Sequence, residues 1–138
     1  MEPIAYNTVT VGDALPPLTL PPVTRTMLAL FAGASGDHNP IHIDTDYARK
    51  AGMPDVFAQG MLPAAYLGRL ITNWAPQQKL RSFNMRFTGI THLGHQLTCR
   101  GRVAEKLERD GQRLVKIDVQ ALNQHGETKV TGEAWIAL

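Results

Sequence analysis

Cysteine is almost absent from the sequence, and apolar runs long enough to span a membrane are absent altogether. Cys99 is the single cysteine among 138 residues, which excludes a disulfide within the chain and argues against a cysteine-based metal site. The most apolar stretch, residues 62–71, is interrupted by Arg69, whereas a membrane-spanning helix needs about 18 apolar residues in succession. No basic segment followed by an apolar one comes after Met1, so no signal peptide is expected. These absences indicate a cytoplasmic protein with no membrane partner.

An excess of charge of one sign is also missing. The chain has 14 Lys and Arg against 12 Asp and Glu, a formal net charge of +2 without a dense basic run. Nucleic-acid-binding domains carry clustered basic residues, so no nucleic-acid partner is expected. Hydrophobic residues make up 43% and charged residues 19%, which is the composition of a globular domain. The length suits one hydrophobic core, and we expect a single domain spanning residues 1–138.

Helix signals dominate the first half of the chain. Thr24 is placed to cap a helix that ends at the two glycines of residues 33–36. Asp44 is placed to cap a short helix that stops at Gly52. Residues 61–74 are apolar on nearly every side, which is typical of a buried helix.

Strand signals follow the long helix. Polar and apolar residues alternate with a period of two in four segments, which are residues 82–87, 96–105, 114–122 and 128–138. Turn residues separate the last three segments, and we expect all four strands to form a meander. A sheet of this kind must curve to cover a long apolar helix. The predicted class is therefore α+β, with a long central helix wrapped by a curved antiparallel β-sheet.

Ionisable side chains are concentrated between Ser35 and Asp44. Asp37 and His42 lie five positions apart, across a turn that Pro40 stiffens. A carboxylate and an imidazole that converge can hold a water molecule and transfer protons near neutral pH. The structural alternative is that Asp37 forms an Asx turn and His42 is a satisfied core histidine. The residue types alone leave both interpretations open.

Gly60, at the start of the long helix, is a second candidate. A glycine there lets a ligand oxygen approach backbone N–H groups at the positive end of the helix dipole. The alternative is that Gly60 only lets the chain turn into the helix.

Taken together, the two segments resemble the MaoC-like dehydratases, with the (R)-specific enoyl-CoA hydratases as the most similar type. The resemblance rests on the motif S-G-D-x-N-P-I-H-x-D at residues 35–44. It continues through Gly-Met-Leu at residues 60–62 to the closing Gly-Glu-Ala-Trp at residues 132–135. The resemblance implies the hot-dog fold, in which a curved antiparallel sheet wraps a long central helix.

The resemblance also implies an activity. Enzymes of this family add water to trans-2-enoyl thioesters to give (R)-3-hydroxyacyl thioesters, or catalyse the reverse dehydration. Asp37 and His42 would form the acid–base pair that acts through a bound water, and the Gly60 N–H would bind the developing enolate oxygen. CoA or acyl carrier protein would carry the acyl group as substrate. No metal or other cofactor is expected, because the thioester is already activated.

Four further residues are implied in substrate binding. Asn39 would hold the shape of the loop or touch a catalytic group. Gln59 stands where the family commonly has histidine, and it is expected to shape the acyl pocket or to pack the loop. Gly68 stands where the hydratases carry a pocket serine; glycine leaves room there, and an inward-facing Tyr66 would remove it.

Two other functions compete with hydration. The chain would be either a non-catalytic hot-dog subunit of a heteromeric hydratase or a hot-dog thioesterase. The presence of both Asp37 and His42 favours hydration, since an inactive subunit has no chemical use for them. Pairing two sheets edge to edge closes exposed strands, and the family does this, so a homodimer is expected, with higher or heteromeric assemblies as alternatives.

Overall fold

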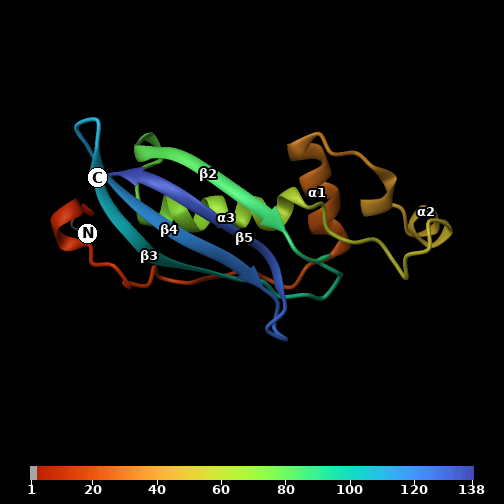
Figure 1. Ribbon diagram of the computed structural model, residues 1–138. Helices are drawn as coiled ribbons and strands as arrows, with labels where there is room; N and C mark the ends of the chain where they lie inside the picture. Colours follow the sequence, from red (N-terminus) through yellow and green to blue (C-terminus); the bar gives the residue numbers. More distant parts are fainter. Residues whose placement is uncertain (1–2) are drawn as a thin grey trace.

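The computed structural model describes residues 3–138, with the α-helices preceding most of the sheet (Figure 1). The α-helices are α1 (Arg25–Ser35), α2 (Thr45–Lys50) and α3 (Met61–Trp74), and the 3₁₀ helices are η1 (Tyr6–Thr8), η2 (Pro40–His42) and η3 (Gln77–Lys79). The strands are β1 (Leu18–Thr19), β2 (Leu80–Phe87), β3 (Thr98–Arg109), β4 (Gln112–Leu122) and β5 (Thr128–Ala137). Within residues 3–138, no helix has the length and apolar character needed to span a membrane.

Local capping signals decide where the helices begin and end, as predicted. The Thr24 side chain accepts a hydrogen bond from the Met27 N–H at the start of α1, and Gly36 ends the helix at a φ of 78°. Asp44 caps α2 by accepting from two backbone N–H groups. The long helix covers the predicted residues 61–74.

The five strands form one antiparallel sheet in the order β1-β3-β4-β5-β2. The predicted meander is therefore wrong for its first member, because β2 pairs with β5 rather than with β3. Tight turns make β3, β4 and β5 neighbours, whereas the connection 88–97 is no hairpin turn and lets the chain cross to the opposite edge. Alternation along the chain identifies a strand without identifying its neighbour.

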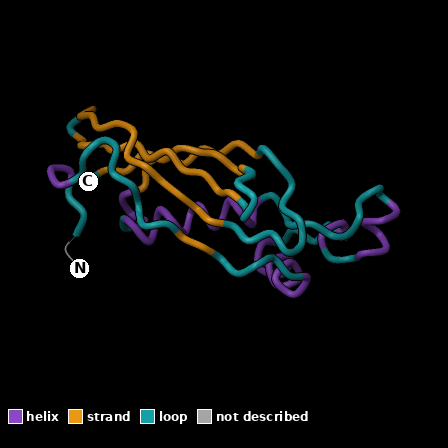
Figure 2. The backbone as a smooth tube through the Cα atoms, turned by 90° about the horizontal axis from the view of Figure 1, so that it is seen from below, coloured by secondary structure: helices purple, strands orange, loops and turns teal. Residues whose placement is uncertain are grey.

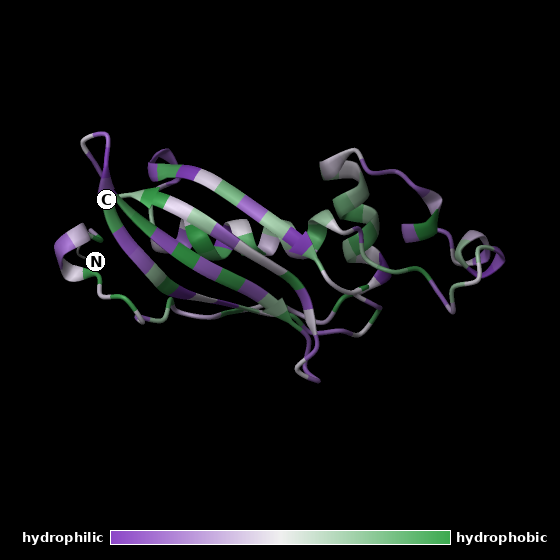
Figure 3. Ribbon diagram, viewed as in Figure 1, coloured by the Kyte–Doolittle hydropathy of each residue, from purple (hydrophilic) through white to green (hydrophobic). Residues whose placement is uncertain are grey.

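The main core lies between α3 and the sheet, which curves over the helix (Figures 1 and 2). Every second residue in the centres of β3 and β4 is buried, namely Cys99, Gly101, Val103, Val115, Ile117, Val119 and Ala121. Leu67, Leu70 and Ile71 of α3 belong to the same core and are at most 1% exposed. Figure 3 shows the alternation as stripes of opposite hydropathy across the strands. The architecture is therefore the α+β wrapped helix of the hot-dog fold.

A second, smaller core holds α1 and α2, which lie beyond the end of the sheet (Figure 1). Its buried residues are Val23, Leu28, Ala48, Val56, Ala58 and Leu62. Val23 precedes α1, and the others come from α1, α2, the first turn of α3 and residues 53–60, which lead from α2 to α3. This core ties the loop that contains Asp37 and His42 to the start of α3.

Gly132 on β5 is expected to tolerate no side chain, because β2 lies too close. A Cβ atom at this position would be 2.5 Å from the backbone oxygen of Asn84 and 3.2 Å from Cγ of Met85. Gly132→Ala should therefore disrupt the pairing of β2 with β5 and cost about 1–3 kcal/mol in the free energy of unfolding. Urea unfolding followed by circular dichroism measures the loss, and an unchanged midpoint would contradict the close packing of these strands.

Candidate active site

The loop after α1 holds its shape through short-range hydrogen bonds of its own side chains. The Asp37 N–H donates to Oγ of Ser35 at 3.1 Å, and Oδ1 of Asp37 accepts from the Asn39 N–H at 3.3 Å. Oδ1 of Asn39 accepts in turn from the Ile41 N–H at 3.1 Å, which caps η2. Asp37 therefore does form an Asx turn. The turn occupies only one of its two carboxylate oxygens.

The other oxygen of Asp37 faces the His42 ring. Oδ2 of Asp37 lies 3.7 Å from Nε2 of His42, beyond the reach of a direct hydrogen bond. The His42 side chain is 10% exposed, while that of Asp37 is 41% exposed. The structural and the chemical interpretations of this loop are therefore compatible, because one oxygen of Asp37 shapes the turn and the other faces the imidazole.

The hydrogen bond on the far side of the ring decides the tautomer of His42. Nδ1 of His42 lies 2.7 Å from the carbonyl oxygen of Phe57, and a carbonyl oxygen only accepts hydrogen bonds. Nδ1 therefore carries a proton, and in the neutral imidazole Nε2 keeps its lone pair and directs it toward Asp37. The Phe57 ring stands edge-on to the imidazole, with the ring centres 5.0 Å apart, and limits its rotation.

This geometry suits proton transfer through a water molecule. Two acceptors 3.7 Å apart can both accept hydrogen bonds from one water, whose hydrogen bonds are about 2.8 Å long. One of the two groups can then take a proton and later return it. The pair can thus act as a general acid–base unit, with Asp37 on the solvent side and His42 held from behind.

Gly60 is the N-cap of α3, with helical dihedral angles of φ −57° and ψ −33°. Among residues 3–138 its N–H donates to no hydrogen-bond acceptor, as expected at the first turn of a helix. A pocket of about 210 Å³ opens beside it, lined by Phe57, Ala58, Gln59, Gly60, Pro63, Phe87, Gly89, Ile90 and Thr91. Phe57 joins the two parts of the site, because its carbonyl binds His42 while the residue also lines the pocket.

Asn39 and Gln59 both have structural contacts. Asn39 shapes the loop through its cap on η2. Gln59 is fully buried, and its Nε2 donates to the carbonyl oxygen of Leu28 at 2.9 Å. This bond ties the start of α3 to the middle of α1. The lining of the pocket includes Gln59 but not Asn39, and a contact of either residue with substrate stays a prediction.

Tyr66 and Gly68 lie farther along α3, outside the lining of this pocket. Tyr66 is half-buried and packs against both hydrophobic cores, and burial raises the pKa of its phenol. A Cβ atom at Gly68 would lie 3.8 Å from Cε1 of Phe83, so the space beside this glycine borders the aromatic ring on β2. A role for Tyr66 or Gly68 in acyl binding stays a prediction.

The part of the site that sequence reasoning missed is the carbonyl oxygen of Phe57. Every residue except proline has the same backbone donor and acceptor, so no residue type in the sequence marks this contact. A larger hollow of about 880 Å³ lies on the outer face of the sheet, among Arg100, Arg102, Asp118 and Gln120. It contains none of the candidate residues, whereas the smaller pocket is lined by Gln59 and Gly60 and is linked to His42 through Phe57, so we place the site at the smaller pocket. Among residues 3–138, no three His, Cys, Asp or Glu side chains are grouped to hold a metal ion.

Known proteins with similar sequences and structures include hydratases and dehydratases. The fold superimposes on the R-hydratase PhaJ1 from Pseudomonas aeruginosa with a TM-score of 0.82 and 32% identity, covering 95% of this chain and 83% of that one. A mitochondrial 3-hydroxyacyl-[acyl-carrier-protein] dehydratase from Arabidopsis thaliana is 29% identical over 105 residues, which are 75% of this chain and 63% of the plant protein.

The fatty acid synthase subunit beta of Saccharomyces cerevisiae is 27% identical over 135 residues, which are 93% of this chain and 6% of the yeast subunit. The chain thus spans less than two thirds of either of these curated relatives. The family described as MaoC like domain matches residues 9–125, which is most of the chain. With the hot-dog fold and the similarity to an R-hydratase, this match shows that the protein belongs to the MaoC-like dehydratase family.

Proposed function

We propose that this protein hydrates trans-2-enoyl thioesters to (R)-3-hydroxyacyl thioesters, or dehydrates the latter. The observation that carries the proposal is the convergence of Nε2 of His42 and Oδ2 of Asp37, 3.7 Å apart, in the segment that leads to the pocket at Gly60. Membership of the MaoC-like dehydratase family and the likeness to an R-hydratase support the same reaction.

In the proposed reaction the Asp37–His42 pair accepts one proton and later donates one. A water molecule hydrogen-bonded to both groups loses a proton to the pair while its oxygen bonds to the β-carbon of the enoyl thioester. The pair then delivers a proton to the α-carbon, so that one water has been added and both side chains return to their starting state. The thioester activates the double bond by itself, and the enoyl thioester needs no reactant other than water.

The Gly60 N–H has the role of oxyanion donor in this proposal. Negative charge develops on the thioester oxygen when water attacks the β-carbon, and a donor already in place stabilises it without reorganisation. The unoccupied N–H of Gly60 and the positive end of the α3 dipole both favour that charge. The acyl carrier is either CoA or acyl carrier protein.

Hydration of crotonyl-CoA by the purified protein tests the function. The conjugated thioester absorbs in the ultraviolet, and its absorbance should fall as the double bond is hydrated. A chiral analysis of the product should give the (R) enantiomer. Release of free thiol, detected with a thiol reagent, would instead identify a thioesterase. The absence of any turnover on CoA and acyl carrier protein thioesters would favour the non-catalytic subunit.

A homodimer is the expected assembly, because the sheet ends in an unpaired edge. Within residues 3–138, β2 pairs with β5 on one side only, and exposed apolar side chains gather near that edge: Met61, Phe87 and Ile90. Light scattering at micromolar concentration should give twice the 15.2 kDa mass of one chain. A stable monomer that turns over enoyl thioesters would overturn this prediction.

A further inference from the structure

The segment between His42 and Phe57 leaves the site and returns to it. After His42 the chain enters α2, and it comes back through residues 53–56 to Phe57, whose carbonyl oxygen holds the imidazole. His42 and Phe57, the hydrogen-bond partner of its ring, are thus the two ends of one excursion of the chain, residues 42–57. Its α2 lies farthest from the sheet (Figure 1). The position of the imidazole depends on what holds the two ends together.

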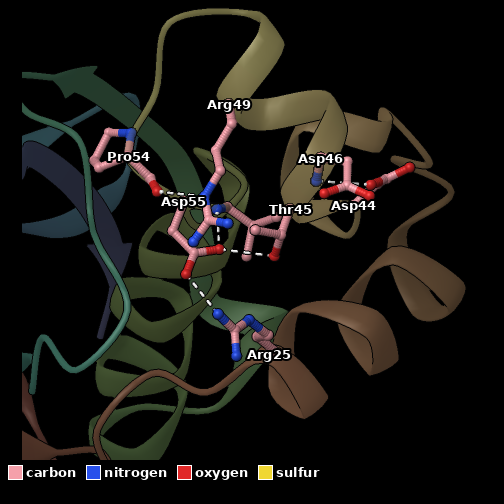
Figure 4. Close-up of polar contacts among 8 residues, drawn as sticks. Arg25, Asp44, Thr45, Asp46, Arg49, Pro54 and Asp55 are labelled. Carbon is pink, nitrogen blue, oxygen red and sulfur yellow. Dashed lines mark hydrogen bonds and ion pairs between the residues drawn. The ribbon is translucent and has the colours of Figure 1, made fainter.

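Asp55 makes the polar contacts at the base of this excursion (Figure 4). Its Oδ1 accepts from Oγ1 of Thr45, the first residue of α2, at 2.9 Å. The same oxygen accepts from the Val56 N–H at 2.7 Å. Oδ2 pairs with the guanidinium of Arg25, the first residue of α1. One carboxylate therefore joins the helix before the catalytic loop, the helix after it and the return segment.

The contacts of Asp55 complete a closed path of backbone and hydrogen bonds that begins and ends at His42. From His42 the chain leads to Thr45, whose hydroxyl binds Asp55; the chain continues from Asp55 to Phe57, whose carbonyl binds His42 again. The Val56 N–H and the Thr45 hydroxyl, followed by Arg25, hold the pKa of Asp55 below its usual value, so the carboxylate is charged at neutral pH. Removing Asp55 would break this closed path between Thr45 and Phe57, on one side of the imidazole.

Other contacts keep the excursion folded without Asp55. Ala48 and Val56 are buried in the second core, Nε of Arg49 donates to the carbonyl of Pro54 at 3.3 Å, and the Met53 N–H donates to the carbonyl of Ala48 at 3.0 Å. The ion pair with Arg25 adds little, because the Arg25 side chain is 63% exposed. Loss of Asp55 should consequently act on the placement of Phe57 and His42 more than on the fold.

We propose that Asp55 is a positioning residue of the active site, which sets the orientation and tautomer of His42 through Thr45 and the Phe57 carbonyl. This inference rests on the proposed hydration for its kinetic consequence, although the geometry of His42 can be measured without substrate. Asp55 itself touches no reacting atom in this proposal.

The test compares Asp55→Ala, Asp55→Asn and Thr45→Val in the full chain. Asp55→Ala should lower kcat for crotonyl-CoA by about 10- to 100-fold with KM within about two-fold, because a small displacement of a catalytic group slows the chemical step. Thr45→Val removes one donor and should show a smaller loss of the same kind. Glu133→Gln and Glu133→Ala are matched controls, because Glu133 is an ion-paired carboxylate on the sheet, 3.0 Å from Nζ of Lys116.

Nitrogen NMR of the His42 imidazole, in protein without substrate, supplies the second measurement. The wild type and the Glu133 variants should show a single neutral tautomer with the proton on Nδ1. Asp55→Ala should show a mixture of tautomers. An unchanged imidazole spectrum in a folded Asp55→Ala variant would overturn the proposal, whatever the protein's activity. If Asp55→Ala fails to fold, the milder Thr45→Val and Asp55→Asn variants decide the question by the same spectrum.

If the wild type turns over no enoyl thioester, the proposed function fails, and the spectrum alone then decides the role of Asp55. If the wild type is active and Asp55→Ala keeps both its kcat and the wild-type imidazole spectrum, the positioning role fails while the function stands.

Discussion

Asp37→Asn is expected to lower kcat by about 10²- to 10⁴-fold while the fold is retained. The amide has almost the same size as the carboxylate, and its oxygen can still accept from the Asn39 N–H, so the Asx turn survives. On the other side an NH₂ group would face Nε2 of His42. It cannot take a proton from water, and it can donate to the lone pair that the proposed reaction uses.

Asp44→Asn is the matched control for this substitution. It makes the same chemical change within the same motif, but Asp44 caps α2, and asparagine is an equally good N-cap. Steady-state kinetics with crotonyl-CoA, together with circular dichroism, should separate the two variants. If folded Asp37→Asn lost less than about ten-fold in kcat, the carboxylate would serve the turn alone.

Gly60→Pro is expected to lower kcat by about 10²- to 10³-fold, which is the cost of losing one oxyanion donor. Proline removes the N–H and leaves Asp37 and His42 untouched. The φ of −57° at Gly60 is the angle that proline requires, and proline is well tolerated where a helix begins. The variant should therefore keep α3 and lose the donor.

Gly60→Ala separates loss of the donor from crowding. Alanine keeps the N–H, and its Cβ atom would meet the ring of Phe87 at 3.6 Å, an ordinary van der Waals contact. We expect Gly60→Ala to retain most of the activity, with unchanged circular dichroism in both variants. Equal and small losses in kcat would mean that another group holds the thioester oxygen.

Local signals in the chain were sufficient to predict the helices. The cap residues Thr24 and Asp44 and the all-round apolar pattern of residues 61–74 predicted the three α-helices, because a helix makes its hydrogen bonds within a few residues of the chain. Asp37 and His42 could be singled out for the same reason, since both lie in one short motif whose turn brings them together.

Contacts between segments far apart in the chain are set by the packing of the whole fold. The pairing of β2 with β5 was not predictable from alternation, because a strand can form its hydrogen bonds with any neighbour. The Phe57 carbonyl that selects the tautomer of His42 has no mark in the sequence, since a carbonyl is common to every residue. No sequence pattern distinguishes Asp55 from other loop aspartates, and its contacts with the first residues of α1 and α2 arise only from the packing of the fold. Which atoms surround a side chain depends on how the whole chain packs, and no local pattern contains that information.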